Sequence, residues 1–190
     1  MEGIEFPLGI SEIIATTKNE RFNAAPMGVI NRGGLFIKMY KNTHTFLNVK
    51  NNEMLVANLV SNPLLYVKAA FDDLEEEHFY EDEGAPILKE AYAWSEFKCA
   101  VVGEEKYQKA ALIRLIPQRW KVLRKSVRPV SRGFNAVIEA AVHGTRYMAF
   151  GDTKCLKNID YYENLVKKCG GLEEREAMSV LRKYLEKAGS

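Results

Sequence analysis

Polar side chains that could bind a phosphate group are concentrated in one short stretch, residues 38–48 (KMYKNTHTFLN). It follows a predicted strand and carries hydroxyl, amide and ammonium groups on Tyr40, Lys41, Asn42, Thr43 and Thr45. A phosphate monoester has several acceptor oxygens and a charge of about −1.5 to −2, so these donors would bind it through charge-assisted hydrogen bonds. If Thr43 begins a short helix, N–H groups of the first turn would add donors. The same residues also fit a strand end followed by an ordinary helix N-cap, so both interpretations stay open here.

A second unusual stretch lies about twenty residues upstream, at residues 16–28 (TTKNERFNAAPMG). A core strand rarely places Asn, two Ala, Pro and Gly so close together, which indicates that something approaches the backbone closely here. That neighbour could be a ligand or another strand inside a small barrel. Since Pro26 has no N–H group, backbone donors to a ligand would come from Asn23, Ala24 and Ala25.

Other common catalytic patterns are absent from the sequence. It contains no phosphate-binding P-loop, no dinucleotide-binding glycine motif, no H-E-x-x-H zinc motif and no G-x-S-x-G nucleophile motif. His44, His78 and His143 have no metal-ligand spacing, so we expect no metal site. The three cysteines are widely separated, which favours free thiols in a reducing, cytoplasmic environment.

Charge and hydropathy limit the possible partners. The net charge is +2, too small to indicate nucleic-acid or membrane binding by itself. An acidic run over residues 72–83 holds eight carboxylates and is expected to be a solvated loop, whereas residues 114–132 hold seven cations. Since Trp120 lies within the basic run, an RNA-binding β-barrel is an alternative function, although an exposed strand face fits the same spacing. We expect no signal peptide and no membrane span.

The elements that position these residues are predicted to be strands in the first part of the chain and helices in the last part. Between residues 34 and 125, short apolar runs rich in β-branched and aromatic residues predict a barrel-like set of antiparallel strands. These strands are expected over residues 34–40, 54–60, 64–71, 91–102 and 107–116, with a turn over 102–107 and one short helix over 43–52.

Helical periodicity begins after about residue 130 and predicts helices over residues 132–150, 158–171 and 172–189. Asp160 and Glu163 would form a capping box at the start of the second helix, and Gly170 would end it in a left-handed cap. The sequence therefore predicts an α+β fold with a β-rich domain over residues 1–130 and a helical appendage over 131–190.

The two polar stretches, as an ordered pair, resemble the FMN-binding split-barrel group that includes the flavin reductases. In that group N-A-A-P lines the isoalloxazine ring, and a later Thr and Asn bind the phosphate before a strand that ends in Asn. Asn23–Pro26 match the first element, and Thr45, Asn48 and the strand ending at Asn58 match the second. The sequence looks closest to an uncharacterised, mainly archaeal branch, whose helical motif residues 132–146 (RGFNAVIEAAVHGTR) resemble.

The resemblance implies a split β-barrel flavoprotein of flavin reductase-like type, with N5 of FMN as the redox centre and no catalytic side chain identified. It implies a homodimer with FMN near the interface and NAD(P)H or a small molecule as redox partner. A non-catalytic FMN-binding or flavin-sensing protein is the alternative. The resemblance implies Asn23, Ala24, Ala25, Pro26, Thr45 and Asn48 as binding residues. The side-chain chemistry described above adds Tyr40, Lys41, Asn42 and Thr43, and Arg132, near a predicted helix start, is a further candidate for the phosphate.

Overall fold

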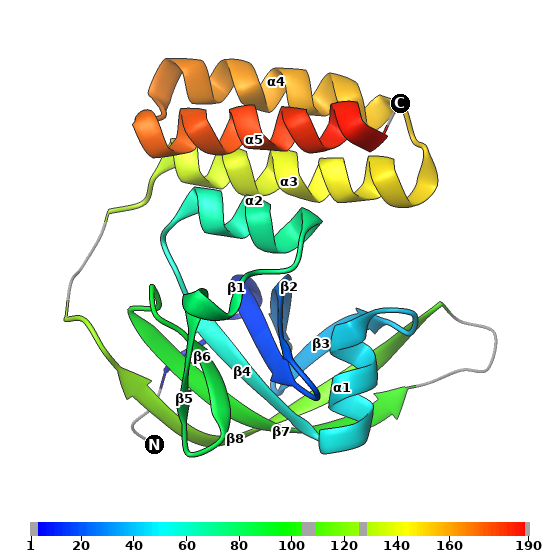
Figure 1. Cartoon of the computed structure of the whole chain (residues 1–190), viewed down its shortest axis with the longest axis vertical. Coiled ribbons are helices and arrows are strands. Elements are labelled where there is room, and N and C mark those ends of the chain that lie inside the picture. Colours follow the sequence, from blue (N-terminus) through cyan, green and yellow to red (C-terminus); the bar gives the residue numbers. More distant parts are fainter. Residues whose placement is uncertain (1–3, 104–108, 126–128, 189–190) are drawn as a thin grey trace. The chain divides into compact units, whose positions relative to one another are not determined.

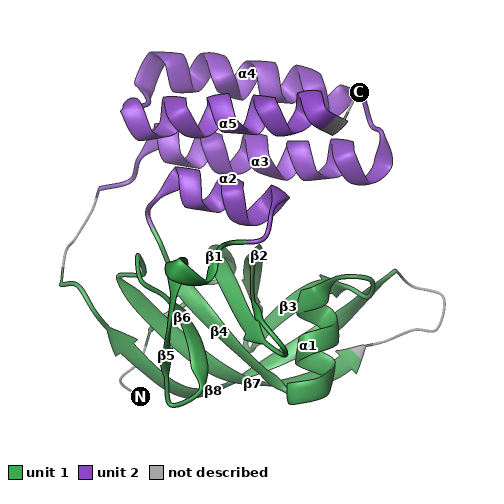
Figure 2. Ribbon diagram, viewed as in Figure 1, with its two compact units in different colours: residues 1–60, 74–126 green, residues 61–73, 127–190 purple. Residues whose placement is uncertain are grey.

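The computed structural model describes residues 4–103, 109–125 and 129–188 and divides the chain into two compact units (Figure 2). The barrel unit comprises Met1–Val60 and Leu74–Ser126, and the helical unit comprises Ser61–Asp73 and Val127–Ser190. The sequence analysis placed one boundary at residue 130. The structure adds an earlier crossing, because residues 61–73 belong with the C-terminal helices. The turn predicted over residues 102–107 falls largely outside the described ranges.

A closed antiparallel barrel forms the body of the first unit, in the strand order β1-β2-β3-β8-β7-β4 (Figure 1). This confirms the predicted α+β class with a β-barrel and C-terminal helices. A two-stranded sheet, β5-β6, accompanies the barrel. The strands are β1 (Gly9–Lys18), β2 (Phe22–Asn31), β3 (Leu35–Tyr40), β4 (Met54–Leu59), β5 (Phe79–Asp82), β6 (Ala85–Leu88), β7 (Ala93–Gly103) and β8 (Ala110–Val122).

Along each strand, successive side chains point alternately into the barrel and toward its outer face. The interior is a core of aliphatic and aromatic side chains that includes Ile13, Ile37, Leu55, Phe97 and Ile113, each at most 1% exposed. Residues of opposite parity in β1 and β4 point outward. On that outer side, β5 and β6 cover a second apolar cluster formed by Val56, Ala85, Ile87 and Trp94.

Helix α1 (His44–Asn52) confirms the short helix predicted after the third strand. Thr43 is its N-cap, and the Thr43 hydroxyl accepts a hydrogen bond from the Phe46 N–H group. Phe46 and Val49 belong to the barrel core, so one face of α1 packs into the barrel. The helix therefore holds the residues after β3 in a fixed position against the strands.

The prediction of a strand over residues 64–71 is wrong, because this segment forms helix α2 (Pro63–Phe71). Asn62 caps the helix by accepting hydrogen bonds from the N–H groups of Leu64 and Leu65, and Pro63 fits the first turn. The segment is apolar on most sides, so it lacks the one-sided periodicity that distinguishes a helix from a buried strand.

Three longer helices complete the helical unit: α3 (Arg132–Phe150), α4 (Lys154–Cys169) and α5 (Leu172–Ala188). The bounds of α3 and α5 agree with the prediction, and Met178, Leu181 and Leu185 are buried as expected. Gly133, near the start of α3, packs closely against Gly170, which follows α4. A Cβ atom on residue 133 would lie 2.7 Å from the Gly170 Cα atom. Of the helices in the described ranges, none is long and apolar enough to span a membrane.

The predicted ends of α4 are wrong. The helix begins four residues earlier, after Thr153, so Asp160 and Glu163 lie in its middle rather than at its N-terminus. Both carboxylates instead bind Arg182 of α5. Burial alone would raise the pKa of Glu163, but hydrogen bonds from Lys167 and Arg182 lower it overall. Gly170 is extended, with φ −87°, so the helix does not end in a left-handed residue there.

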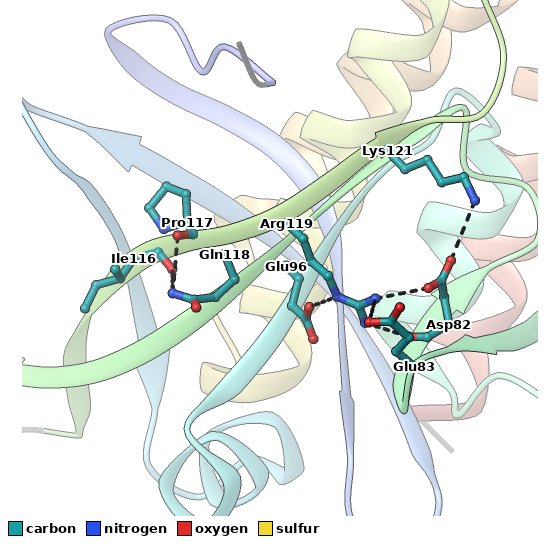
Figure 3. Close-up of polar contacts among 8 residues, drawn as sticks. All are labelled: Asp82, Glu83, Glu96, Ile116, Pro117, Gln118, Arg119 and Lys121. Atoms are coloured by element: carbon teal, nitrogen blue, oxygen red, sulfur yellow. Dashed lines mark hydrogen bonds and ion pairs between the residues drawn. The ribbon is translucent and has the colours of Figure 1, made fainter. Parts of the chain in front are cut away.

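The acidic run and the basic run predicted as separate features meet in the barrel unit (Figure 3). The end of the acidic run forms β5 and the turn after it, rather than a solvated loop. The Arg119 guanidinium binds the carboxylates of Asp82, Glu83 and Glu96, and it also donates to the Asp82 carbonyl oxygen at 2.6 Å. Part of the basic run therefore neutralises part of the acidic run within the protein.

A β-bulge directs Arg119 to this cluster. Between β7 and β8, Phe97 pairs with Pro117 and Glu96 pairs with Arg119, so Gln118 has no partner in the register. The extra residue changes the alternation of β8 and places Arg119 on the same face as Glu96. Without the bulge, Arg119 would point to the opposite face.

Thiol reactivity should distinguish the three free cysteines. Burial, and to a lesser extent Glu53, raises the pKa of the Cys99 thiol to about 12, and Cys155 is also buried, whereas Cys169 is exposed. Since the thiolate is the reactive form, one equivalent should react rapidly with Ellman's reagent at pH 8 in native protein, and all three after denaturation. Cys169→Ser should abolish the rapid phase. Equally rapid labelling of Cys99 in native protein would contradict this assignment.

Candidate functional site

Within the closed barrel, the wall between β2 and β3 is paired over only a short stretch, and we call the unpaired stretch the opening. Strands β2 and β3 pair only at Ile30–Phe36 and Asn31–Leu35, next to the turn that joins them. Residues 23–29 of β2 therefore have no register partner in β3, and alternate backbone N–H and C=O groups on this edge face the opening. This is the backbone edge that the sequence predicted to receive a ligand.

Side-chain exposure confirms that this part of the wall is open. On the inward face of β1, Ile13, Ala15 and Thr17 are at most 2% exposed. Their partners on the same face of β2 are Met27, Ala25 and Asn23, and all three are only partly buried. The β2 side of the barrel wall is therefore less covered than the β1 side.

The two alanines of the N-A-A-P segment face opposite sides of β2. Ala25 pairs with Ala15 of the inward face and lines the opening, whereas Ala24 pairs with Thr16 on the outer face and is 7% exposed. The small sheet packs on that outer face, since the Thr16 hydroxyl donates to the Pro86 carbonyl oxygen. The side chain of Ala24 is therefore small because of packing. Among these two alanines, only Ala25 can contact a molecule in the opening through its side chain.

Four predicted or adjacent polar residues come together where α1 meets β1 and β2. The Asn23 amide donates to the Thr45 hydroxyl at 2.9 Å, and the Asn48 amide donates to the Thr17 hydroxyl at 3.0 Å. Thr45 and Asn48 are 2% and 7% exposed. The structure thus joins the N-A-A-P stretch to the Thr–Asn stretch, which are separated in sequence.

Asn58 does not join this group. Its amide is fully buried, donates to the Ile14 carbonyl oxygen and the Thr16 hydroxyl, and accepts from the Leu88 N–H group. These bonds tie β4 to β1 and β6. The asparagine at the end of the predicted strand therefore has a structural role.

The turn between β3 and α1 supports both interpretations of residues 40–45. The Thr43 hydroxyl donates its one proton to the Tyr40 carbonyl oxygen at 2.8 Å and accepts from the Phe46 N–H group, so in this position it has no proton left to donate to a phosphate. The N–H groups of His44 and Thr45 lie in the first turn and have no acceptor within the helix. Lys41 and Asn42 extend the donor set, and Tyr40 is 48% exposed.

A small pocket of about 150 Å³ lies beside this helix start. Its lining includes three charged or titratable residues that the sequence analysis did not name as site candidates, Glu20, Arg21 and His44. Arg21 precedes Asn23 by two residues, and His44 follows the N-cap directly, so proximity to the two motifs was the available signal. The full lining is Asn19, Glu20, Arg21, Asn23, His44 and Asn48. Arg132, the further candidate for the phosphate, begins α3 in the helical unit.

The fold is therefore an antiparallel β-barrel in which part of β2 has no partner in β3 and a small polar pocket lies at a helix start. The family follows from comparison with known proteins. Residues 11–123 match the N-terminal domain of the protein of unknown function DUF447, and residues 131–183 match a second DUF447 model. The chain belongs to the DUF447 family, which confirms the predicted uncharacterised branch.

Several proteins of known sequence or structure are similar to this chain. The crystal structure of FMN-bound protein MM1853 from Methanosarcina mazei is 38% identical, covers 94% of this chain and 96% of its own, and has a TM-score of 0.86. Uncharacterized protein MJ1453 from Methanocaldococcus jannaschii is 28% identical over 93% of this chain and 98% of its own length. An FMN-binding protein from Thermus thermophilus, 14% identical, covers 69% of this chain and 86% of its own with a TM-score of 0.51, which supports the fold alone.

Proposed function

We propose that this protein binds FMN in the opening between β2 and β3, with the phosphate at the start of α1. The observation that supports this most directly is the FMN-bound relative MM1853, which is 38% identical and similar along nearly the whole chain. The residues present fit the cofactor. A flat ring can lie against the small Ala25 side chain and accept hydrogen bonds from the unpaired backbone edge of β2.

The phosphate would bind at the polar group around α1. First-turn N–H groups of α1 point toward the helix start, where the helix dipole favours an anion. Thr45, Asn23 and Asn48 supply hydroxyl and amide groups there, Arg21 lines the adjacent pocket, and Lys41 lies in the turn before the helix. These groups match a phosphate monoester better than they match a neutral ligand.

Bound FMN would supply hydride or electron transfer at N5, and the chain would bind the ring, orient it and limit its access to water. We therefore propose an FMN-dependent oxidoreductase, with NAD(P)H or a small molecule as the redox partner. Anaerobic stopped-flow mixing with NADH and NADPH tests this, since bleaching of the flavin band is expected with at least one of them. A flavin that neither nucleotide reduces would favour the non-catalytic alternative.

FMN should bind more tightly than riboflavin. If the α1 start holds the phosphate, loss of that group removes charge-assisted hydrogen bonds of about 1.5–3 kcal/mol each, so riboflavin affinity should fall at least about tenfold. Fluorescence titration of cofactor-free protein measures both affinities, and raising the salt concentration should narrow the difference. Equal affinities for FMN and riboflavin would refute the phosphate assignment.

We also propose that two copies associate through the outer face of the barrel. The strand registers place Ile10, Ile30 and Phe36 in one row across β1, β2 and β3. The row continues to Arg114 on β8, and Leu112 and Ile116 flank Arg114 on the same face. Ile10 is 65% exposed and Ile116 is 40% exposed, so this face carries uncovered apolar area. Light scattering after gel filtration should give twice the 21.6 kDa chain mass, and Ile10→Glu should reduce it to one chain.

A further inference from the structure

The turn that joins β1 to β2, residues 19–21, lines the pocket proposed for the flavin phosphate. All three of its residues belong to the lining, and α1 contributes His44 and Asn48 to the same pocket. The turn follows the last pair of the β1–β2 register, Lys18–Phe22. The shape of the pocket therefore depends on where these two strand ends hold the turn relative to α1.

Helix α1 holds the inward face of the strand ends. The Asn48 amide donates to the Thr17 hydroxyl at 3.0 Å, and the Asn23 amide donates to the Thr45 hydroxyl at 2.9 Å. Thr17 and Asn23 are a register pair, so each of the two strands has one hydrogen bond to the helix directly before the turn. These bonds fix one side of the hairpin that carries the turn.

Strand β5 holds the outer face of the same strand ends. Alternation turns the next pair, Lys18 and Phe22, to the outer side. The Lys18 ammonium forms an ion pair with Glu81 and lies 5.6 Å from the centre of the Phe22 ring. The Phe22 ring packs against Phe79, with ring centroids 5.2 Å apart, and Phe79 is 4% exposed. Both strand ends are therefore held from this side too.

The β5–β6 hairpin is itself fixed to the barrel. Arg119 binds the carboxylates of Asp82 and Glu83, which directly follow Glu81 (Figure 3). The Thr16 hydroxyl donates to the Pro86 carbonyl oxygen. Because the hairpin is anchored independently of the turn, its contacts with the strand ends can set the position of the turn.

We infer that Phe79 and Glu81 are positioning residues for the phosphate group of the flavin. Neither side chain lines the pocket, but both hold the strand ends that carry its turn. When one of these contacts is lost, the turn shifts relative to α1 and its hydrogen bonds to the phosphate weaken, since such bonds need distances of about 2.7–3.2 Å. The inference rests on the proposed function, and it assigns the loss to the phosphate rather than to the ring.

Charge reversal at Glu81 separates positioning from simple electrostatics. Glu81→Lys makes the protein more positive, which by itself would favour an anion such as FMN. It also breaks the ion pair with Lys18, whose side chains are 45% and 42% exposed. We therefore expect FMN affinity to fall about two- to fivefold while riboflavin affinity stays unchanged. Fluorescence titration of the cofactor-free full-length protein measures both affinities.

Three further variants control for charge and for the ring contact. Lys18→Glu combined with Glu81→Lys has the net charge of the wild type and should restore most of the lost FMN affinity. Glu76→Lys makes the same charge change outside these contacts and should not weaken FMN binding. Phe79→Leu removes the contact between the rings and should lower the ratio of FMN affinity to riboflavin affinity about two- to tenfold.

Magnetic resonance measures the position of the turn without flavin. In cofactor-free protein, the heteronuclear NOE of the Asn19 and Glu20 N–H groups should fall in Glu81→Lys and recover in the charge-reversed double variant. The inference is overturned if Glu81→Lys keeps the wild-type preference for FMN over riboflavin, or if the double variant does not recover it. Equal binding of FMN and riboflavin by the wild type would overturn the proposed phosphate site as well.

Discussion

Protein carrying Ala25→Leu should be purified without the yellow colour of bound flavin, yet its cofactor-free form should unfold near the wild-type temperature. Ala25 faces the opening beside β2 and is only partly buried, so three added carbons would occupy the space proposed for the ring. Overpacking costs about 1–3 kcal/mol, and here that cost falls on binding, which corresponds to roughly fivefold to more than a hundredfold in FMN affinity. Fluorescence titration and thermal unfolding of cofactor-free protein measure the two effects separately.

Ala24→Leu is the matched control, because it adds the same atoms one residue earlier in the strand. Ala24 is 7% exposed and packs on the face covered by the small sheet. This variant should lower the free energy of unfolding of the cofactor-free protein by about 1–3 kcal/mol. If Ala25→Leu lost stability instead and bound FMN normally, the ring would not lie in the opening.

The sequence predicted the elements whose local signals agree with their packing. The N-cap residue Thr43 was sufficient to predict α1, and one-sided periodicity was sufficient to predict α3 and α5. Capping and amphipathic spacing are local properties that a short sequence window contains. Helix α2 was predicted as a strand because its environment buries most of its sides. Burial by other segments is a tertiary property that a local window does not contain.

Only part of the candidate site was predicted from the sequence, because the orientation of its side chains is also a tertiary property. Asn23 and Thr45 were identified from motif types, and the structure joins them through one hydrogen bond. The opposite orientation of Ala24 and Ala25 depends on which face the small sheet covers, and Arg21 and His44 become neighbours only when α1 packs beside β2. Residue types therefore indicated the chemistry, whereas the strand register determined which side chains can take part.

The largest effect on stability is expected when the ion pairs between the acidic run and the basic run are broken. Arg119→Ala should lower the free energy of unfolding by about 2–3 kcal/mol, because it leaves the buried Glu96 carboxylate without its guanidinium partner. The hydrogen bond to Glu96 also raises the pKa of the Arg119 guanidinium. Urea unfolding of cofactor-free protein measures the change, and the loss of the hairpin contacts should also expose the cluster around Trp94.

Two further variants separate this ion pair from surface charge effects. Lys121→Ala removes a more exposed cation, 3.8 Å from Asp82, and should cost less than about 1 kcal/mol. Glu96→Gln combined with Arg119→Ala should be less destabilising than the sum of the single changes, because the buried charge is absent from the double variant. If Arg119→Ala and Lys121→Ala were equally mild, or if the two changes at Glu96 and Arg119 were additive, Arg119 would act as an ordinary surface cation and the bulge at Gln118 would have no stabilising role.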